Sequence, residues 1–227
     1  TVTGVQTCAL PILEDITLRA LRVLRECDVV AAEDTRRTAQ LLRHFEITKP
    51  LLSYFQFNEA KRSEEIIERL QRGEKVALAT DAGTPGISDP GERVVRAVIA
   101  AGLRVESVPG ACALVSALTA SGLPTDEFHF IGFLPHKSGQ RRNELTRLSQ
   151  LTGTLVLYES PYRIEKLLGE LNEMMPERTV VLARELTKKF EEFLRGTPAA
   201  LLERAKQRPL KGEFVVLVSP VAAANGD

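Results

Sequence analysis

Short apolar runs of strand length alternate with helical hydrophobic patterns along most of the chain. The runs at 29–32 and 76–79 contain only Val, Ala and Leu, and Leu, Ile and Val recur at helical spacing between them. A wholly apolar strand between two helical patterns is typical of a parallel strand covered on both faces. Strand and helix alternate four times before residue 122, which predicts a mostly parallel α/β sheet.

The second half of the chain continues the alternation, with no internal repeat. Gly122-Leu123-Pro124 and the polar residues after it form a natural hinge, so we place a domain boundary there. The resulting expectation is two α/β domains, at 13–123 and 124–220, followed by a tail at 221–227. Residues 128–133 open the second unit. Strands are predicted at 154–158, 180–183, 191–195 and 214–218, and helices around 164–171 and 198–206.

The first twelve residues differ in character from the rest. Residues 2–12, VTGVQTCALPI, resemble the conceptual translation of a sequencing-library adapter along their whole length. We therefore treat residues 1–12 as a non-native segment and leave them out of the predicted fold. The alternative is a genuine short strand of odd composition.

A turn rich in glycine and proline follows the apolar run 76–79. Gly83 and Gly86 allow positive φ angles and close approach of the backbone to a ligand, and Pro90 suits the first position of the next helix. In open α/β sheets, ligands bind at the carboxyl ends of the strands. The turn matches neither GxGxxG nor GxxxxGK[ST], so it is either a ligand loop of another kind or a tight strand-to-helix connection.

Two acidic residues, Glu33 and Asp34, follow the apolar run 29–32 and precede a predicted helix that Thr35 is placed to cap. Carboxylates at a strand end can bind hydroxyl groups or act as general bases. The alternative is a capped and solvated helix start.

Composition limits the candidate chemistry. Thirty basic and thirty acidic residues give a formal net charge of zero, so nucleic-acid binding would need a local basic patch. The densest one, PHKSGQRR at 135–142, suits either phosphate contact or a flexible solvated loop. Three dispersed cysteines and three scattered histidines indicate a reducing cytosol and predict no metal site. No apolar run approaches membrane-spanning length, and no secretory leader is visible.

Seven stretches of the chain, taken together, resemble one known family. They occur in register and are similar to the ribosomal RNA small subunit methyltransferase I family, the ribose-2′-O-methylating branch of the tetrapyrrole-methylase superfamily. The resemblance covers essentially all of residues 13–219. The stretches are AEDTR (32–36), DAGTPGISDPG (81–91), SGLPTD (121–126), GFLP (132–135), YESP (158–161) followed by Arg163, ARELTK (183–188) and KGEF (211–214).

The resemblance implies a cytoplasmic S-adenosylmethionine-dependent methyltransferase of two α/β domains with the cofactor in the cleft between them. It implies a homodimer whose substrate is a cytidine ribose of small-subunit (16S) ribosomal RNA at the decoding centre, or the 30S particle that contains it. Carried over by position, the implied cofactor-binding residues are Asp81, Ala82, Gly83, Ile87, Cys112, Ala113, Tyr158, Ala183 and Gly212.

Methyl transfer to a ribose hydroxyl needs a proton acceptor and residues that bind the phosphates of the RNA backbone. Carboxylates at predicted strand ends or turns are Asp34, Glu59, Asp89 and Glu185, of which we expect Asp34 first, then Glu59, with Glu185 as a further catalytic candidate. The candidate RNA-binding residues are Arg36, Arg62, Lys137, Arg141, Arg142, Arg163 and Arg184.

The sequence departs from the family pattern in three places. The family opens with an apolar strand and a TPIGN turn, whereas here ALPI at 9–12 runs straight into Leu13-Glu14-Asp15. Histidines that precede the Asn-Glu pair in many members are replaced by Phe55-Gln56-Phe57. Many members also continue into a small helical segment, whose contribution to RNA affinity is not expected here. Two other functions remain open: a tetrapyrrole C-methyltransferase, and a non-catalytic cofactor- or RNA-binding module.

Overall fold

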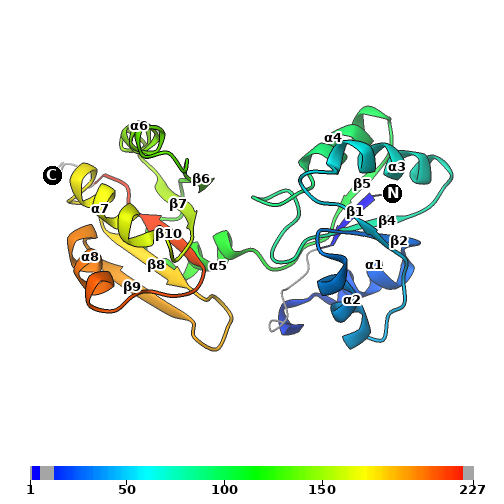
Figure 1. The fold of residues 1–227 in the computed structure, drawn as a ribbon, viewed down its shortest axis with the longest axis horizontal. Coiled ribbons are helices and arrows are strands. Elements are labelled where there is room, and N and C mark those ends of the chain that lie inside the picture. The colour runs from blue at the N-terminus through cyan, green and yellow to red at the C-terminus, as the bar shows by residue number, and fades with distance from the viewer. Residues whose placement is uncertain (1, 6–12, 222–227) are drawn as a thin grey trace. The chain divides into compact units, whose positions relative to one another are not determined.

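The chain folds into two compact units, each built around its own sheet. The computed structural model describes residues 2–5 and 13–221, and the units comprise Thr1–Cys112 and Ala113–Asp227 (Figure 1). The sequence places the boundary after residue 123 instead. The two divisions differ by helix α5 (Ala113–Ser121), whose Ala117 and Leu118 pack with strands of the second unit.

The first unit contains a parallel sheet of five strands in the order β3-β2-β4-β1-β5. This arrangement confirms the parallel α/β sheet predicted from the alternating pattern. The strands are β1 (Val2–Val5), β2 (Val29–Ala32), β3 (Leu51–Ser53), β4 (Val76–Ala79) and β5 (Val105–Ser107). The helices are the 3₁₀ turn η1 (Leu13–Asp15), α1 (Leu18–Glu26), α2 (Thr35–His44), α3 (Glu59–Gln71) and α4 (Glu92–Ala100).

Helices cover both faces of this sheet, which explains why its inner strands are wholly apolar. Successive side chains of a strand point to opposite faces. Val76 and Leu78 of β4 therefore pack in one cluster with the buried residues of α3 and α4, whereas Ala77 and Ala79 pack in another with those of α1 and α2. Figure 1 shows the two helix pairs on opposite sides of the strands.

Strand β1 lies within the segment that the sequence analysis set aside. Val2–Val5 pairs in parallel with β4 on one side and with β5 on the other. The segment thus forms the short strand that the alternative interpretation describes. The rest of the adapter-like stretch, residues 6–12, lies outside the described residues.

Helix starts follow the predicted chemistry in one case out of three. Thr17 caps α1 as its spacing suggests, because its hydroxyl accepts a hydrogen bond from Ala20 N at 3.1 Å. The expectation for Thr35 is wrong: Asp34 is the N-cap of α2 and accepts from Arg36 N at 2.8 Å. The expectation for Pro90 is also wrong, because α4 begins at Glu92 and Gly91, at φ 148°, takes the cap position.

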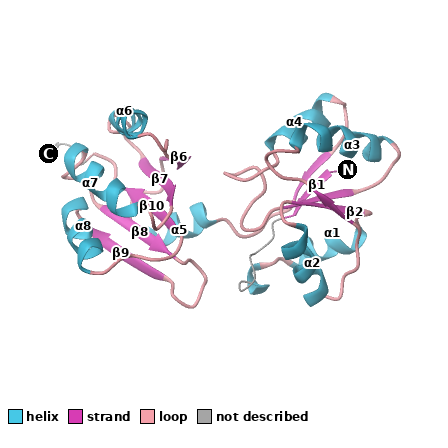
Figure 2. Ribbon diagram, viewed as in Figure 1, coloured by secondary structure: helices cyan, strands magenta, loops and turns pink. Residues whose placement is uncertain are grey.

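The second unit contains a mixed sheet of five strands in the order β6-β7-β10-β8-β9, in which only β6 and β7 are parallel neighbours. Three helices, α6, α7 and α8, supply the side chains that pack on one face, and α5 supplies those on the other (Figure 2). The strands are β6 (Phe128–Phe133), β7 (Thr154–Glu159), β8 (Val180–Arg184), β9 (Glu192–Gly196) and β10 (Phe214–Val218). The helices after α5 are α6 (Ser138–Leu148), α7 (Ile164–Met174) and α8 (Pro198–Gln207).

Helix α6 corrects one reading of the sequence. The basic stretch at 135–142 has a flexible solvated loop as one of its two interpretations, yet most of it begins a helix of eleven residues. Leu145 and Leu148 anchor this helix in the core, and the third buried position is Arg141. A buried arginine interrupts the apolar stripe, so the hydrophobic pattern alone did not reveal the helix.

Candidate ligand site

The carboxyl edge of the parallel sheet brings two loops together through their own carboxylates. Asp81 N, after β4, donates to Glu33 Oε2 at 3.1 Å, and Asp34 N, after β2, donates to Asp81 Oδ1 at 3.2 Å. Because β2 and β4 are parallel neighbours, the ends of both strands lie at the same edge. Each loop thus fixes the backbone of the other. These hydrogen bonds hold the first residue, Asp81, of the ligand loop predicted from the sequence.

Asp34 is held as a structural carboxylate at this edge. Besides capping α2, it forms a two-point interaction with Arg36, whose Nε and Nη2 lie 3.1 and 2.8 Å from its two oxygens. The side-chain hydrogen bonds from Arg36, followed by that from its backbone N–H, lower the pKa of Asp34 to about 2. Such a carboxylate is a weak proton acceptor near neutral pH. The structure thus favours the capped helix start over the general-base interpretation for Asp34.

Glu59, the first residue of α3, forms hydrogen bonds to residues at the end of β3 and at the start of α4. Its Oε1 accepts from the hydroxyl of buried Tyr54 at 3.0 Å and from Gly91 N at 3.2 Å. Burial, with smaller contributions from Glu59, raises the pKa of Tyr54 to about 12, so the phenol stays protonated and keeps donating. Glu59 therefore fixes the start of α4 against the end of β3, a role that the sequence did not indicate.

A pocket of about 490 Å³ opens beside these groups, entirely within the first unit. Among its charged residues, Glu33, Glu59 and Asp89 are half-buried, whereas Arg93 and Arg96, on the first turns of α4, are exposed. Burial, and then the charges of Glu33 and Asp81, raise the pKa of Asp89 to about 7. The other lining residues are Gln56, Ser88, Pro90, Gly91 and Glu92.

The glycine-rich turn directly precedes this pocket along the chain. Gly83 has φ +72°, and a Cβ atom built on it would meet no atom within 4 Å. Ala82 and Ile87 are exposed, whereas Asp81 is half-buried and forms an ion pair with Arg37 at 3.3 Å. Burial raises the pKa of Asp81, while Arg37 acts in the opposite direction. Four of the five predicted cofactor residues of the first unit thus lie on one loop with open space in front of Gly83.

The predicted cofactor residues of the second unit also gather at one place. Tyr158 of β7 and Ala183 of β8 both pair with Val215 of β10, so the three form one row across the sheet. Leu114 N, next to Ala113, donates to the Tyr158 hydroxyl at 3.2 Å. Cys112, the remaining predicted residue, ends the first unit.

The backbone of Gly212 packs closely against the side chain of Glu185 near the same end of the second sheet. Gly212 has φ +96°, and a Cβ atom on it would lie 2.5–2.7 Å from side-chain atoms of Glu185. Glu185 accepts from Glu213 N at 3.0 Å and from Lys188 Nζ at 3.1 Å. Burial raises the pKa of Glu185, but these two donors outweigh it and hold the pKa below its usual value. The environment therefore keeps Glu185 ionised and internally paired.

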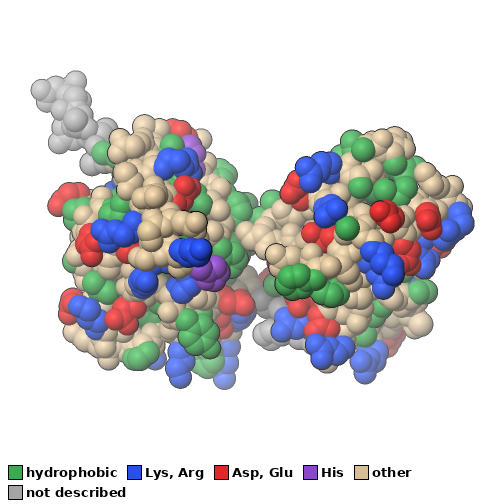
Figure 3. All heavy atoms as spheres, turned by 45° about the horizontal axis from the view of Figure 1, so that its top comes forward, with side chains coloured by type: hydrophobic (Ala, Val, Ile, Leu, Met, Phe, Trp, Pro, Cys, Tyr) green, Lys and Arg blue, Asp and Glu red, His purple; other side chains and the backbone are tan. Residues whose placement is uncertain are grey.

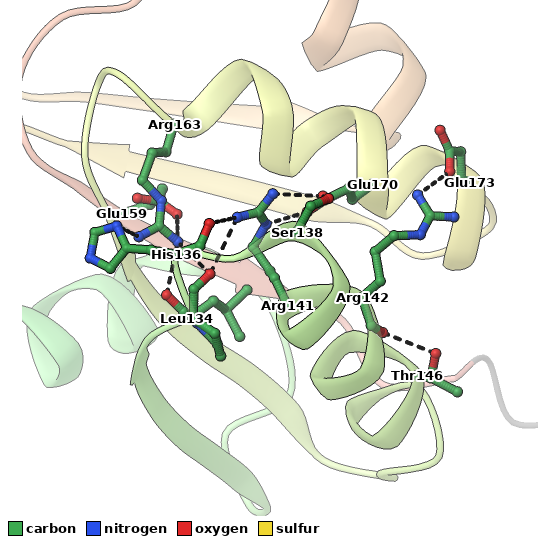
Figure 4. A network of polar contacts seen from close by, with 11 residues as sticks. Leu134, His136, Ser138, Arg141, Arg142, Thr146, Glu159, Arg163, Glu170 and Glu173 are labelled. Carbon is green, nitrogen blue, oxygen red and sulfur yellow. Dashed lines mark hydrogen bonds and ion pairs between the residues drawn. The ribbon is translucent and has the colours of Figure 1, made fainter.

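Two of the predicted RNA-binding arginines instead anchor a loop of the second unit (Figure 4). Arg141 is 3% exposed, forms a two-point ion pair with Glu170, and donates to the carbonyls of Pro135 and His136. Arg163 reaches the same loop from the start of α7, where it donates to Leu134 O at 2.8 Å. It also lies 3.2 Å from His136 Nδ1 and from Glu159 Oε2. These contacts give both arginines a structural role.

The remaining candidate cations differ in how accessible they are. Arg184 is bound to Glu192 and to Lys211 O, and half-buried Arg62 is paired with Glu65. Exposed positions are held by Arg36, Lys137 and Arg142, of which Arg142 pairs with Glu173 at 2.6 Å. Figure 3 shows basic and acidic side chains interspersed on the drawn face of each unit. RNA contacts are therefore expected from a few accessible side chains.

Residues 2–5 and 13–221 contain neither a metal-binding cluster nor a membrane-spanning helix. No three His, Cys, Asp or Glu side chains there are placed to hold a metal ion. Nor does that part of the chain contain a helix with the length and apolarity needed to cross a membrane.

Comparison with known structures agrees with the observed architecture. Diphthine synthase superposes with a TM-score of 0.72 at 16% identity, covering 96% of this chain and 90% of that one. Uroporphyrin-III C-methyl transferase from Thermus thermophilus, solved with S-adenyl homocysteine, gives a TM-score of 0.65 at 20% identity, covering 96% of each chain. At these identities the likeness concerns the fold.

Sequence comparison places the chain among the methylases. The profile of the family Tetrapyrrole (Corrin/Porphyrin) Methylases matches residues 12–202, and the chain belongs to this family. Within it, the chain falls in the ribosomal RNA small subunit methyltransferase I group. The protein of that name from Halalkalibacterium halodurans is 47% identical over 206 residues, which are 91% of this chain and 71% of the relative. Its counterpart from Pseudomonas aeruginosa is 48% identical over 219 residues, 95% of this chain and 77% of the relative.

Proposed function

We propose that this chain transfers a methyl group from S-adenosylmethionine to the 2′-hydroxyl of a cytidine in small-subunit ribosomal RNA. The observation that carries the proposal is identity of nearly half, over more than nine-tenths of the chain, to proteins named ribosomal RNA small subunit methyltransferase I. The expected setting is the bacterial cytoplasm, with the 30S particle or its RNA as partner and a homodimer as the active form.

The residues on the loop after β4 fit such a cofactor. Gly83 leaves open space where a side chain would otherwise stand, and neighbouring Ala82 adds only a methyl group. Carboxylates at the same edge, Asp81 and Asp89 among them, complement a ligand that carries a positive sulfonium. We assign the methyl donor to Asp81, Ala82, Gly83, Ile87 and Cys112 of the first unit and to Ala113, Tyr158, Ala183 and Gly212 of the second.

The chemistry divides between the cofactor and the chain. S-adenosylmethionine, when bound, supplies an electrophilic methyl group on sulfur. The chain must hold the ribose hydroxyl in line, exclude water and accept one proton. Alignment alone can lower a barrier by about 7–11 kcal/mol in the best cases. The cross-bonded loops after β2 and β4 supply the rigid frame that alignment requires.

Methyl transfer from labelled S-adenosylmethionine tests the proposal. Unmodified 30S particles and a porphyrinogen are offered in parallel, and we expect label only in the RNA, in a nucleotide resistant to alkaline cleavage on its 3′ side. Label in the porphyrinogen would favour the tetrapyrrole C-methyltransferase. Binding of S-adenosylhomocysteine without transfer to either substrate would favour the non-catalytic binding module.

Replacing Gly83 by valine is expected to weaken binding of S-adenosylhomocysteine at least tenfold. A branched side chain would fill the space in front of the loop and strain a backbone at φ +72°. Titration calorimetry measures the affinity, and Gly102→Val serves as a control, since Gly102 has a similar φ of +69° with open space but lies at the end of α4. Equal losses in both variants, or none in Gly83→Val, would contradict the assignment of the loop.

A further inference from the structure

The pocket beside the start of α4 has no assigned ligand, although it adjoins the loop to which the methyl donor is assigned. Its volume of about 490 Å³ lies within the range of roughly 300–1,000 Å³ typical of small-molecule sites. All of its lining residues belong to the first unit, so the pocket is complete within that unit. Ser88 and Asp89, which line it, follow directly on Ile87 of the cofactor loop.

Charge is arranged unevenly over this pocket. Arg93 and Arg96, three residues apart on α4, are exposed, and Arg96 lies 3.5 Å from exposed Glu92. Glu33, Glu59 and Asp89 are half-buried. Exposed cations suit phosphate groups, and half-buried carboxylates suit the hydroxyls of a ribose. The lining therefore suits a nucleotide whose ribose contacts the half-buried carboxylates and whose phosphates contact the exposed arginines.

An exposed aromatic side chain stands on the loop that contributes Gln56 to the pocket. Phe57 is 88% exposed, and its ring lies 6.2 Å from that of Phe55 in an edge-on arrangement. Exposed aromatic rings are the usual stacking partners of unpaired bases in single-stranded RNA. This loop thus offers a base-stacking face next to the pocket lining.

Of the three half-buried carboxylates, Asp89 is the one whose position suits proton transfer. Glu59 Oε1 is occupied by Tyr54 and Gly91, and Glu33 Oε2 by the backbone of Asp81. Among the described residues, no hydrogen bond or ion pair engages the Asp89 carboxylate. Ser88, the residue before it, has a positive φ of 61°, a strained conformation that often accompanies a functional side chain.

We infer that this pocket receives the nucleotide to be methylated and that Asp89 accepts the proton of its 2′-hydroxyl. The inference rests on the proposed function. In the reaction the O–H bond breaks and its proton passes to Asp89, the ribose oxygen forms a bond to the methyl carbon, and the carbon–sulfur bond of the sulfonium donor breaks, leaving a neutral thioether. Charges are balanced, because one cation and one carboxylate are both neutralised.

The environment of Asp89 agrees with this role. The charged groups that face it are Glu33 after β2, Asp81 after β4, Glu59 on α3, and Glu92, Arg93 and Arg96 on α4. Burial and the first two of these raise the pKa of Asp89 to about 7. A general base with a pKa near the working pH combines a useful ionised fraction with good proton affinity. The ionised fraction of Asp89 increases as the pH rises through 7, and the transfer rate should increase with it.

The first test compares Asp89→Asn with Glu64→Gln, a control at an exposed position on α3. We expect Asp89→Asn to slow methyl transfer to unmodified 30S particles about 10²- to 10⁴-fold and to abolish the rise in rate between pH 6 and 8. Glu64→Gln should keep both the rate and the pH profile. Affinity for neutral S-adenosylhomocysteine should stay within about twofold in each variant, which would show that the cofactor loop is intact.

Two further measurements do not depend on turnover. Carbon-13 NMR of labelled aspartate side chains in the cofactor-free protein should show one carboxyl titrating near pH 7, absent in Asp89→Asn. Phe57→Ala should weaken binding of an unmodified single-stranded RNA of the target sequence about five- to 150-fold. The matched control is Phe190→Ala, an exposed ring of the second unit.

The outcomes separate this inference from the proposed function. If the unaltered protein transfers no methyl group to the particle, the proposed function falls and the inference with it. If the unaltered protein is active but Asp89→Asn keeps its rate and pH profile, only the inference is overturned. Absence of any aspartate titrating between about pH 6 and 8 also overturns it, without reference to a variant.

Discussion

Replacing Glu170 by alanine is expected to lower the free energy of unfolding by about 3–5 kcal/mol. Glu170 and Arg141 are 6% and 3% exposed at their side chains, and two hydrogen bonds of 2.5 and 2.7 Å join them. Removal of the carboxylate leaves a guanidinium charge buried, with only the carbonyls of Pro135 and His136 as partners. Chemical denaturation followed by circular dichroism measures the change.

The same helix offers a matched control for this experiment. Glu173, one turn further along α7, pairs with Arg142, but both side chains are about half exposed. Glu173→Ala should therefore change the stability by no more than about 1 kcal/mol. The double variant Arg141→Met with Glu170→Leu should recover part of the loss, because no unpaired charge remains in the core. A similar loss for Glu170→Ala and Glu173→Ala would show that burial does not set the strength of these pairs.

Gly91→Ala is expected to cost about 2–5 kcal/mol of stability, through backbone strain and crowding acting together. Gly91 has φ +148°, and a Cβ atom on it would lie 3.1 Å from Gly86 N and from Leu78 Cδ2. Relief would require movement of the turn that carries Asp89, so transfer activity should also fall. Thermal unfolding and the methyl-transfer assay provide the two measurements.

Gly73→Ala isolates the strain contribution. Gly73 also has a positive φ, +89°, but a Cβ atom there would meet nothing within 4 Å. The expected loss is about 1 kcal/mol, with no effect on transfer, because Gly73 lies at the end of α3. If the two alanine variants had equal stability, crowding at the start of α4 would be negligible and the turn would be freer than its contacts indicate.

The buried strands were predictable because a strand covered on both faces appears in the sequence as an uninterrupted run of apolar residues. The runs 29–32, 76–79 and 214–218 coincide with β2, β4 and β10, all of which are wholly buried. Helix α6 was hidden because its buried face includes Arg141, whose partner Glu170 lies on another helix. Long-range pairing of charges leaves no periodic signal in the sequence.

The candidate site was predictable as a loop but not as a set of contacts. The turn at 81–91 could be located from its glycines and its place after an apolar strand. The role of Asp34 as cap depended on the position of Arg36, and that of Glu59 on Tyr54 and Gly91, which come from other parts of the unit. From the sequence, Asp89 is one of four candidate carboxylates, and only the pocket and the nearby acids distinguish it from the others.

The position of β1 has a consequence for how the first unit forms during synthesis. Val2 aligns with Val76 on one side and with Val105 on the other, so β1 acquires its second neighbour only after β5, much later in the chain, has been made. Until then β1 lacks one of its two partners, and contacts of such high sequence separation form slowly. Newly made chains should therefore pass through an interval in which an open strand edge is exposed to other chains, and assistance from chaperones would be most valuable then.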